Sequence, residues 1–144
     1  MSRKRIFVAS ALSPMLPDGW TGSDSERTTE MQRIFAMNIK RAEAFCRWVV
    51  DDKCMRPFAP HLFYTRFLDE FSEAERNLGI QMGLEDMEEC HQLWAFLPKD
   101  VRPTRGMTLE IAKATKLGMT IRIYTYEEWS AWMPKELLDL PVAA

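Results

Sequence analysis

The sequence predicts a three-layer α/β sandwich, in which helices cover both faces of a parallel sheet of four to five strands. Three observations lead to this prediction. Short apolar runs, typical of buried strands, alternate with longer segments of helical periodicity. The 144 residues suffice for one domain of ordinary size. The 47% of hydrophobic residues exclude a largely disordered chain.

The first half of the chain contains two predicted strands and a long helix. Residues 5–10 form the first strand, with the apolar run IFVAS. A loop rich in Pro, Gly, Ser and Asp follows at residues 13–25. Across residues 27–52, apolar side chains recur at three- and four-residue steps, which predicts a long helix. The second strand follows this helix and is short, because Pro57 and Pro60 lack the N–H group for a sheet hydrogen bond.

The second half continues the alternation of helix and strand. Ser72 and Glu75 form a predicted capping box, which begins a helix that ends at about Glu89. The remaining predicted elements are a strand at 93–97, a helix at about 107–117 that Gly118 closes, a strand at 119–124, and short helical turns at 126–140. Strands that alternate with helices in this way form βαβ units, whose crossovers are right-handed.

Composition excludes several functions. With 19 basic against 21 acidic residues, the chain lacks the positive charge of a typical nucleic-acid-binding module. Its three cysteines include no CxxC pair and its two histidines are isolated, so we expect no metal site. No apolar run reaches the ~20 residues of a membrane span. We interpret the start of the chain as a strand and not a signal peptide, and expect a cytoplasmic protein without a cofactor.

Ligands of parallel α/β sheets bind outside the carboxyl ends of the strands. The loop after the third strand carries the strongest signal there, in Arg105, Gly106 and Met107. Gly106 lets a ligand approach the backbone, the following helix N-terminus favours an anion or a ribose oxygen, and Arg105 is a candidate to meet a phosphate. Glu110 has two interpretations: it complements the helix dipole from the first turn, or it is a carboxylate nucleophile that points into the pocket.

The residues that follow the second strand face the same crevice. Pro60, His61 and Tyr64 are candidate ligand-binding residues there. We expect His61 to hold a phosphate or a ribose hydroxyl, and Tyr64 to stack on a base. The alternative is that His61 caps the strand end through backbone hydrogen bonds while Phe63 and Phe67 belong to the core.

Several segments resemble a family of small, uncharacterised phage and bacterial proteins. They are VAS at the end of the first strand, RPFAPHLFYTRFLDE, ERNLGIQMGLEDMEECHQLWAFL and RGMTLEIAKATKLGMTIRIY. That family is similar to the nucleoside 2-deoxyribosyltransferases and the deoxynucleoside 5′-monophosphate N-glycosidases. The resemblance covers roughly residues 6–124, except for about 13–33, which looks like an insertion. It implies a single domain, residues 1–144, with a Rossmann- or flavodoxin-like sheet.

The resemblance also implies roles for individual residues. In the enzymes, the Glu of a Gly-x-x-x-Glu stretch attacks the anomeric carbon, and Glu110 matches that position. An acidic residue of the enzymes aligns with Gly83, and a second one aligns with His91. His91 is therefore a candidate acid–base group, unless it is an exposed histidine at a helix end. Asp69 is a further candidate for acid–base work, and Ser10 follows the first strand where the enzymes carry an aromatic hydroxyl.

We therefore expect a protein that binds a nucleoside, a nucleotide or a related ribosyl compound, and that cleaves or transfers an N-glycosidic bond through Glu110. The alternative is a binding protein that sequesters or senses a nucleotide-derived metabolite without chemistry. The resemblance implies a homodimer or larger assembly. Apolar residues near the C-terminus bury either against a partner or against the chain's own sheet; they are Trp129, Trp132, Met133, Leu137 and Leu138.

Overall fold

A parallel sheet organises the computed structural model, which describes residues 2–16, 18–99 and 102–138. Its strands within the described residues are β1 (Arg5–Ala9), β2 (Arg56–Phe58), β3 (Gln92–Phe96) and β4 (Thr120–Tyr124). They pair in the order β2-β1-β3-β4, and every pairing is parallel. The predicted α/β fold with a Rossmann- or flavodoxin-like sheet is confirmed.

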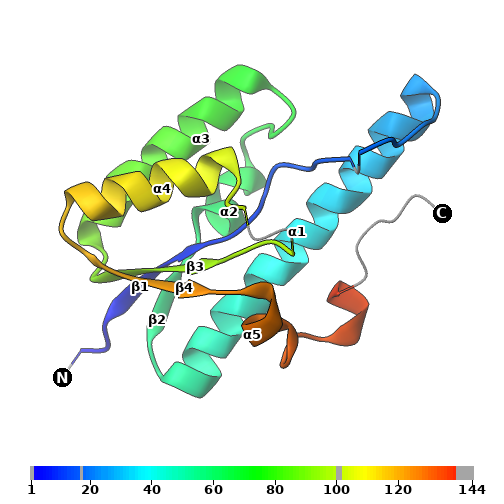
Figure 1. The fold of residues 1–144 in the computed structure, drawn as a ribbon. Coiled ribbons are helices and arrows are strands. Elements are labelled where there is room, and N and C mark those ends of the chain that lie inside the picture. Colours follow the sequence, from blue (N-terminus) through cyan, green and yellow to red (C-terminus); the bar gives the residue numbers. More distant parts are fainter. Residues whose placement is uncertain (1, 17, 100–101, 139–144) are drawn as a thin grey trace.

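Helices cover both faces of the sheet (Figure 1). The described helices are α1 (Asp24–Lys53), α2 (Pro60–Phe63), α3 (Glu73–Asp86), α4 (Arg105–Lys116) and α5 (Tyr126–Ser130), with 3-10 turns at Tyr64–Arg66, Met87–Glu89 and Lys135–Leu137. Helices α3 and α4 lie on one face, and α1 and α5 lie on the other. The direction of the crossovers changes between β1 and β3, so the switch point of the strand order lies between these two central strands.

Helix α1 begins earlier than its periodicity predicts. The Ser23 hydroxyl accepts a hydrogen bond from the Glu26 N–H, and the Glu26 carboxylate accepts one from the Ser23 N–H. This capping box starts the helix at Asp24. The loop predicted at residues 13–25 is therefore two residues too long, because Asp24 and Ser25 already belong to the helix.

Two local predictions around β2 and α3 also need correction. Pro60, which is predicted above only to limit the second strand and to bind a ligand, occupies the start of α2, where its missing N–H costs nothing, so a helical turn follows β2. The Ser72 hydroxyl caps α3 by accepting from the Glu75 N–H, as predicted. The Glu75 carboxylate does not complete the box, because it accepts a hydrogen bond from the Asp69 N–H instead.

The central strands β1 and β3 are buried on both faces and so separate two apolar cores. The core under α3 and α4 contains Phe7, Ala9, Met87, Leu93, Ala95, Leu97, Met107 and Ala114. The core under α1 contains Ile6, Val8, Phe45, Val49, Ala59, Trp94, Phe96, Trp129 and Met133. Because both faces of these strands are buried, nearly every residue in their sequences is apolar.

The C-terminal aromatic residues pack against the chain's own sheet, which is the second of the two predicted alternatives. The Trp129 indole N–H donates a hydrogen bond to the Leu97 carbonyl at 2.8 Å. The Trp132 ring stacks on Trp48 of α1, with 4.8 Å between ring centroids and 3° between planes. These side chains are therefore part of the fold and are not left over for a partner.

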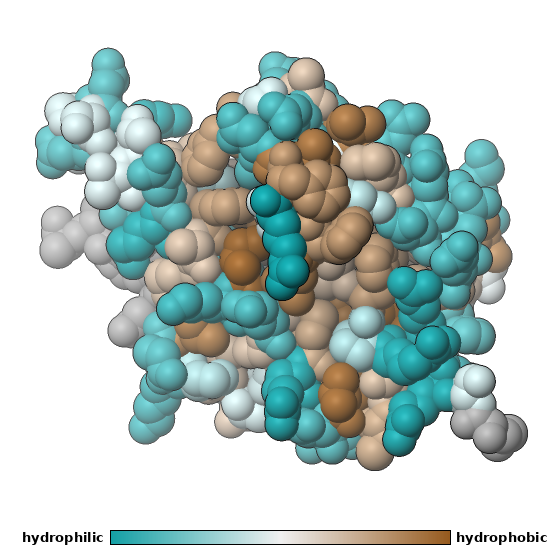
Figure 2. Space-filling model, turned by 180° about the vertical axis from the view of Figure 1, so that it is seen from behind, coloured by the Kyte–Doolittle hydropathy of each residue, from teal (hydrophilic) through white to brown (hydrophobic). Residues whose placement is uncertain are grey.

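Apolar side chains also gather on the face of the molecule that Figure 2 shows, within a surround of hydrophilic ones. Phe63 and Phe67 are 52% and 60% exposed, so the prediction that they belong to the core is wrong. Their rings contact each other, with 5.4 Å between centroids.

No helix among the described residues is long and apolar enough to cross a membrane.

Candidate functional site

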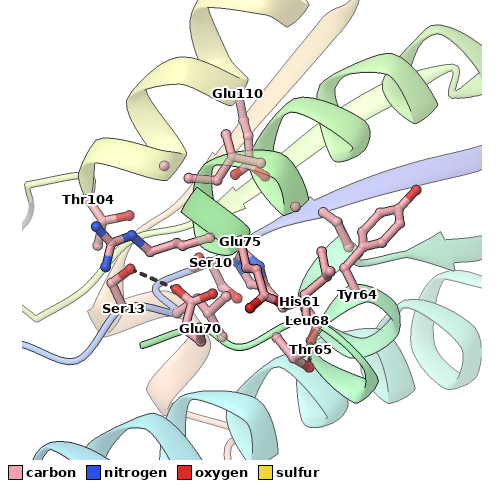
Figure 3. Close-up of a pocket in the computed structure, with 16 residues that line it drawn as sticks. Ser10, Ser13, His61, Tyr64, Thr65, Leu68, Glu70, Glu75, Thr104 and Glu110 are labelled. Atoms are coloured by element: carbon pink, nitrogen blue, oxygen red, sulfur yellow. Dashed lines mark hydrogen bonds between the residues drawn. The ribbon is translucent and has the colours of Figure 1, made fainter. Parts of the chain in front are cut away.

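A small pocket lies at the carboxyl edge of the sheet, beside the switch point between β1 and β3 (Figure 3). Its walls come from the residues after β1, from α2, from α3 and from the first half of α4. The cavity has a volume of about 50 Å³. That is room for a few water molecules or a small polar group.

Glu110 is the most unusual side chain of this pocket. It is 6% exposed, and its Oε1 has no hydrogen-bond partner among the described residues. Burial raises the pKa of this carboxyl to about 8. Figure 3 shows it extending from α4 toward Ser10 and His61.

The position of Glu110 follows from the way α4 is built. The Thr104 hydroxyl caps the helix by accepting from the Met107 N–H at 3.3 Å. Residues at the helical spacing of Met107, Glu110 and Ala114 then share the face that is buried against the sheet. The interpretation of Glu110 as a dipole-complementing residue of the first turn is wrong, because α4 has no acidic residue there and Glu110 faces inward.

Ser10 forms the second unsatisfied group. It lies directly after β1 and is 2% exposed, and its Oγ has no hydrogen-bond partner in the part of the chain that the structure describes. Its carbonyl oxygen accepts a hydrogen bond from Nε2 of His61 at 2.7 Å. Two buried polar atoms without partners therefore line one pocket, where a ligand could satisfy them.

The His61 side chain both binds the backbone after β1 and lines the pocket. Because a carbonyl oxygen can only accept, Nε2 carries the proton that it donates to Ser10. Burial lowers the pKa of His61, which favours the neutral ring with Nδ1 as an acceptor. The predicted alternative, a backbone-capping histidine, describes this contact, although the ring also lines the cavity.

Two acidic residues line the opposite wall. The Glu70 carboxylate accepts a hydrogen bond from the Ser13 hydroxyl at 3.1 Å, drawn as a dashed line in Figure 3. Burial raises the pKa of Glu70 and favours its protonated form. Glu75 lies beside it, together with Arg76. Asp69 is the acid–base candidate that the sequence predicts in this segment, but its neighbour Glu70 is the residue that lines the cavity.

Tyr64 and Pro60 line the pocket as predicted. The Tyr64 hydroxyl donates to the Asp86 carboxylate, and burial together with this bond raises the pKa of the phenol to about 12. Pro60 packs against Gly83 of α3, where an added Cβ would lie 3.0 Å from the Cβ of Pro60. A side chain at this position, which the resemblance aligns with an acid, would therefore fit only if Pro60 moved by a few tenths of an ångström.

Four predicted residues lie outside this pocket. His91 is exposed at the amino end of β3, the edge opposite the pocket, and its Nδ1 accepts from the Arg5 N–H at 2.9 Å. Asp69 is exposed and accepts from the Phe71 N–H. The remaining two flank Gly106, which does line the pocket: Met107 is buried in the core and Arg105 lines a neighbouring groove. Within the described residues, no group of three or more His, Cys, Asp or Glu side chains could hold a metal ion.

Fold and pocket together define an α/β protein with a parallel sheet and, at the carboxyl edge of that sheet, a small pocket that contains two unsatisfied polar side chains. The chain belongs to the family described as Domain of unknown function (DUF7768), whose model matches residues 30–124. The match includes Pro60, His61 and Glu110 and ends with β4, but it does not include Ser10. No curated protein matches the chain.

Proposed function

We propose that this protein binds a nucleoside, a nucleotide or a related ribosyl compound at the carboxyl edge of its sheet, and that it cleaves or transfers the N-glycosidic bond through Glu110. The observation that carries the proposal is the buried Glu110 carboxyl, whose Oε1 has no partner in the pocket. The resemblance to nucleoside 2-deoxyribosyltransferases adds support, because it assigns the nucleophile to this same position.

In the proposed reaction, a carboxylate oxygen of Glu110 bonds to the anomeric carbon while the C–N bond breaks. The electron pair of that bond leaves with the base, which takes a proton from Glu70. Water or a second base then attacks the anomeric carbon, breaks the ester to Glu110 and gives its proton back to Glu70. Glu70 suits this role because burial raises its pKa and it lines the same cavity. In this proposal Glu70 takes the acid–base role for which the sequence suggested Asp69 and His91, because those two residues lie outside the pocket.

The absence of a charge partner for Glu110 favours catalysis over tight binding of a neutral sugar. A carboxylate in a desolvated site gains most when positive charge develops next to it, as it does on the sugar in an oxocarbenium-like transition state. With a pKa of about 8, most Glu110 side chains hold a proton in the free protein at neutral pH. The proposed nucleophilic form therefore becomes more abundant as the pH rises toward 8.

The test uses a panel of deoxynucleosides and their 5′-monophosphates. We expect chromatography to detect free base, and intact-protein mass spectrometry to detect a deoxyribosyl adduct on the wild-type chain. Glu110→Gln should show neither, whereas Glu127→Gln, which changes an exposed glutamate of α5, should behave like the wild type. No base release and no adduct with any substrate would contradict the proposed reaction.

The binding protein without chemistry remains the second proposal, and the packing of Gly83 favours it. Residue 83 of α3 is Gly, and an added Cβ there would already lie 3.0 Å from the Cβ of Pro60, so α3 supplies no acid at the position that the resemblance aligns with one. Calorimetry distinguishes the two proposals: a binder would show affinity for a nucleoside or nucleotide without base release, and this affinity would change in Glu110→Gln.

We also propose a homodimer or larger assembly in the cytoplasm. The assembly is supported by the resemblance alone. The C-terminal aromatic residues do not add support, because they pack against the chain's own sheet. The cytoplasmic location is supported by the three cysteines, which are all free thiols. Light scattering that gives a mass of 16.8 kDa at micromolar concentration would contradict the assembly.

A further inference from the structure

Four large apolar side chains are exposed on α2, on α3 and on the segment between these helices. Phe63, Phe67, Phe71 and Leu78 are between 46% and 60% exposed, and every exposed phenylalanine of the described residues is among them. Figure 2 shows apolar side chains gathered within a hydrophilic surround. We call these four residues the phenylalanine patch. Single exposed apolar residues are ordinary, but a group of this kind is typical of a contact surface.

Helix α2 is apolar on its inner side and on its outer side. Leu62 packs against the core under α1, whereas its neighbour Phe63 is exposed. Tyr64 lines the Glu110 pocket, and its ring contacts Phe63 and Phe67 at 5.0 Å and 6.0 Å between centroids. A helix at a protein surface usually presents polar side chains outward. The outer side of α2 therefore has the composition of a surface that another layer covers.

The apolar area of the phenylalanine patch is close to what a dimer needs. A fully covered aromatic side chain buries ~150–250 Å², so four side chains at about half exposure leave roughly 300–500 Å² to be buried. A standard interface covers ~800 Å² on each partner, and about 60% of it, or roughly 500 Å², is apolar. The patch therefore supplies most of the apolar area of such an interface.

Charged side chains beside the patch are not paired within the chain. Arg66 directly precedes Phe67, and Asp69 and Glu73 lie on either side of Phe71 in the sequence; the three charged residues are exposed. None of them takes part in an ion pair among the described residues. Because both chains present the same surface in a symmetric contact, unpaired charges of both signs make this surface complementary to a second copy of itself. The two acids also disfavour a membrane with anionic headgroups.

We infer that the phenylalanine patch is the interface between two copies of this chain in a symmetric dimer. The patch of one copy packs on the patch of the other, and Arg66 of each copy pairs with Asp69 or Glu73 of the second copy. The inference rests on the proposed assembly, to which it assigns a surface, and it needs no chemistry at Glu110.

The first test is sedimentation velocity of the full chain at micromolar concentration. We expect the wild type to have about twice the mass of one chain. Phe63→Ala and Phe67→Ala should each weaken the dimer about a hundredfold, because each change removes an apolar contact from both halves of a symmetric interface. Circular dichroism checks that these variants are folded, which we expect because both side chains are exposed. Ile123→Ala is the matched control: it shortens a 44%-exposed side chain of β4, at the opposite edge of the sheet from β2, and should leave the dimer unchanged.

The second test reverses the charges. Arg66→Glu alone, and the double variant Asp69→Lys with Glu73→Lys alone, should each be monomeric, because like charges would then face each other across the interface. An equimolar mixture of the two variants should recover the dimer, because opposite charges face each other again. Recovery on mixing also shows that neither variant has lost its fold.

Four results would overturn the inference. They are a wild type with the mass of one chain, a dimer that persists in both phenylalanine variants, an equal loss in Ile123→Ala, and a mixture of the charge variants that stays monomeric. Vesicles of equal parts phosphatidylcholine and phosphatidylserine test the membrane alternative: flotation of a monomeric wild type, lost in Phe67→Ala, would assign the patch to a lipid surface instead.

Failure of the proposed reaction is seen separately. A dimer that depends on the phenylalanine patch but releases no base would contradict the reaction and support the interface. A monomeric wild type that releases base would contradict the interface and leave the reaction in place.

Discussion

Polar groups at the amino end of the parallel sheet are hydrogen-bonded, whereas two polar side chains at its carboxyl end are not. At the amino end, Nδ1 of His91 accepts from the Arg5 N–H and the His91 N–H donates to the Arg5 carbonyl at 2.8 Å. The Arg5 guanidinium also reaches the Glu89 carboxylate at 3.3 Å. At the carboxyl end, Oγ of Ser10 and Oε1 of Glu110 are buried and have no partner.

This difference separates structural from functional polar residues without any alignment. Leaving a buried polar atom unsatisfied costs about 1–3 kcal/mol, so such atoms persist where something other than the folded chain meets them. His91 completes the hydrogen bonding of a strand end and needs no other explanation. Ser10 and Glu110 have no such explanation among the residues that the structure describes.

The largest expected effect concerns the rate at the carboxyl end. Glu110→Ala should reduce base release by about 10⁴–10⁶-fold, as loss of a covalent nucleophile does in other enzymes. Measured base release with the best substrate of the panel tests this. A reduction of less than tenfold in a folded variant would show that Glu110 is not the nucleophile.

The next largest effect is on stability. Glu110 has a pKa of about 8 in the folded protein, against about 4.5 without burial. Between these pH values the folded state holds a proton that the unfolded state releases, so the free energy of unfolding falls as the pH rises. With ~1.4 kcal/mol for each pKa unit, this loss is roughly 3–5 kcal/mol between pH 4.5 and 8.

Urea unfolding at pH 5 and pH 9 measures this effect, with Glu110→Gln as the comparison. The variant lacks the titrating group, so we expect it to match the wild type at pH 5 and to exceed it in stability at pH 9. Equal stability of the two proteins at both pH values would mean that the Glu110 carboxylate finds a partner that lowers its pKa.

The sequence predicts most of the fold because periodicity and apolar runs reflect burial directly. The runs of β1 and β3 are buried on both faces, and the α1 pattern matches its buried Ile34, Phe45 and Val49. Boundaries are harder to predict, because capping contacts decide them. The Ser23–Glu26 pair starts α1 within a segment whose composition is typical of a loop.

The site could be predicted only in part. The presence of Glu110 in the pocket can be predicted, because it lies four residues after Gly106, near the start of a helix that follows a strand. His91 lies away from the pocket for a physical reason that the sequence contains: it precedes β3, and residues before a parallel strand lie at the amino edge. Glu70 was missed because residues 64–72 have no periodic pattern from which to orient its side chain.

A smaller effect concerns α3, which forms one wall of the pocket and carries two glycines, Gly79 in that wall and Gly83 against Pro60. In Gly83→Ala the added Cβ would lie 3.0 Å from the Cβ of Pro60, so α2 must shift. We expect a net loss of about 1–2 kcal/mol in the free energy of unfolding, because overpacking outweighs the helix propensity of alanine. Gly79→Ala is the matched control: its nearest contact is Leu68 Cδ1 at 3.5 Å, so we expect a gain of about 0.5–1 kcal/mol. Urea unfolding of both variants measures the difference, and two changes of the same sign would contradict it.

The smallest effect is at the amino end and tests the other half of the comparison. His91→Ala removes the acceptor of the Arg5 N–H, a bond at an exposed position that water can replace. We expect a loss of about 0.5–1.5 kcal/mol in the free energy of unfolding and no change in base release. Glu89→Gln, which removes only the exposed ion pair with Arg5, should cost less than about 1 kcal/mol. If base release fell strongly in His91→Ala while stability stayed the same, His91 would belong to a site, and the contrast between the two sheet ends would not separate structure from function.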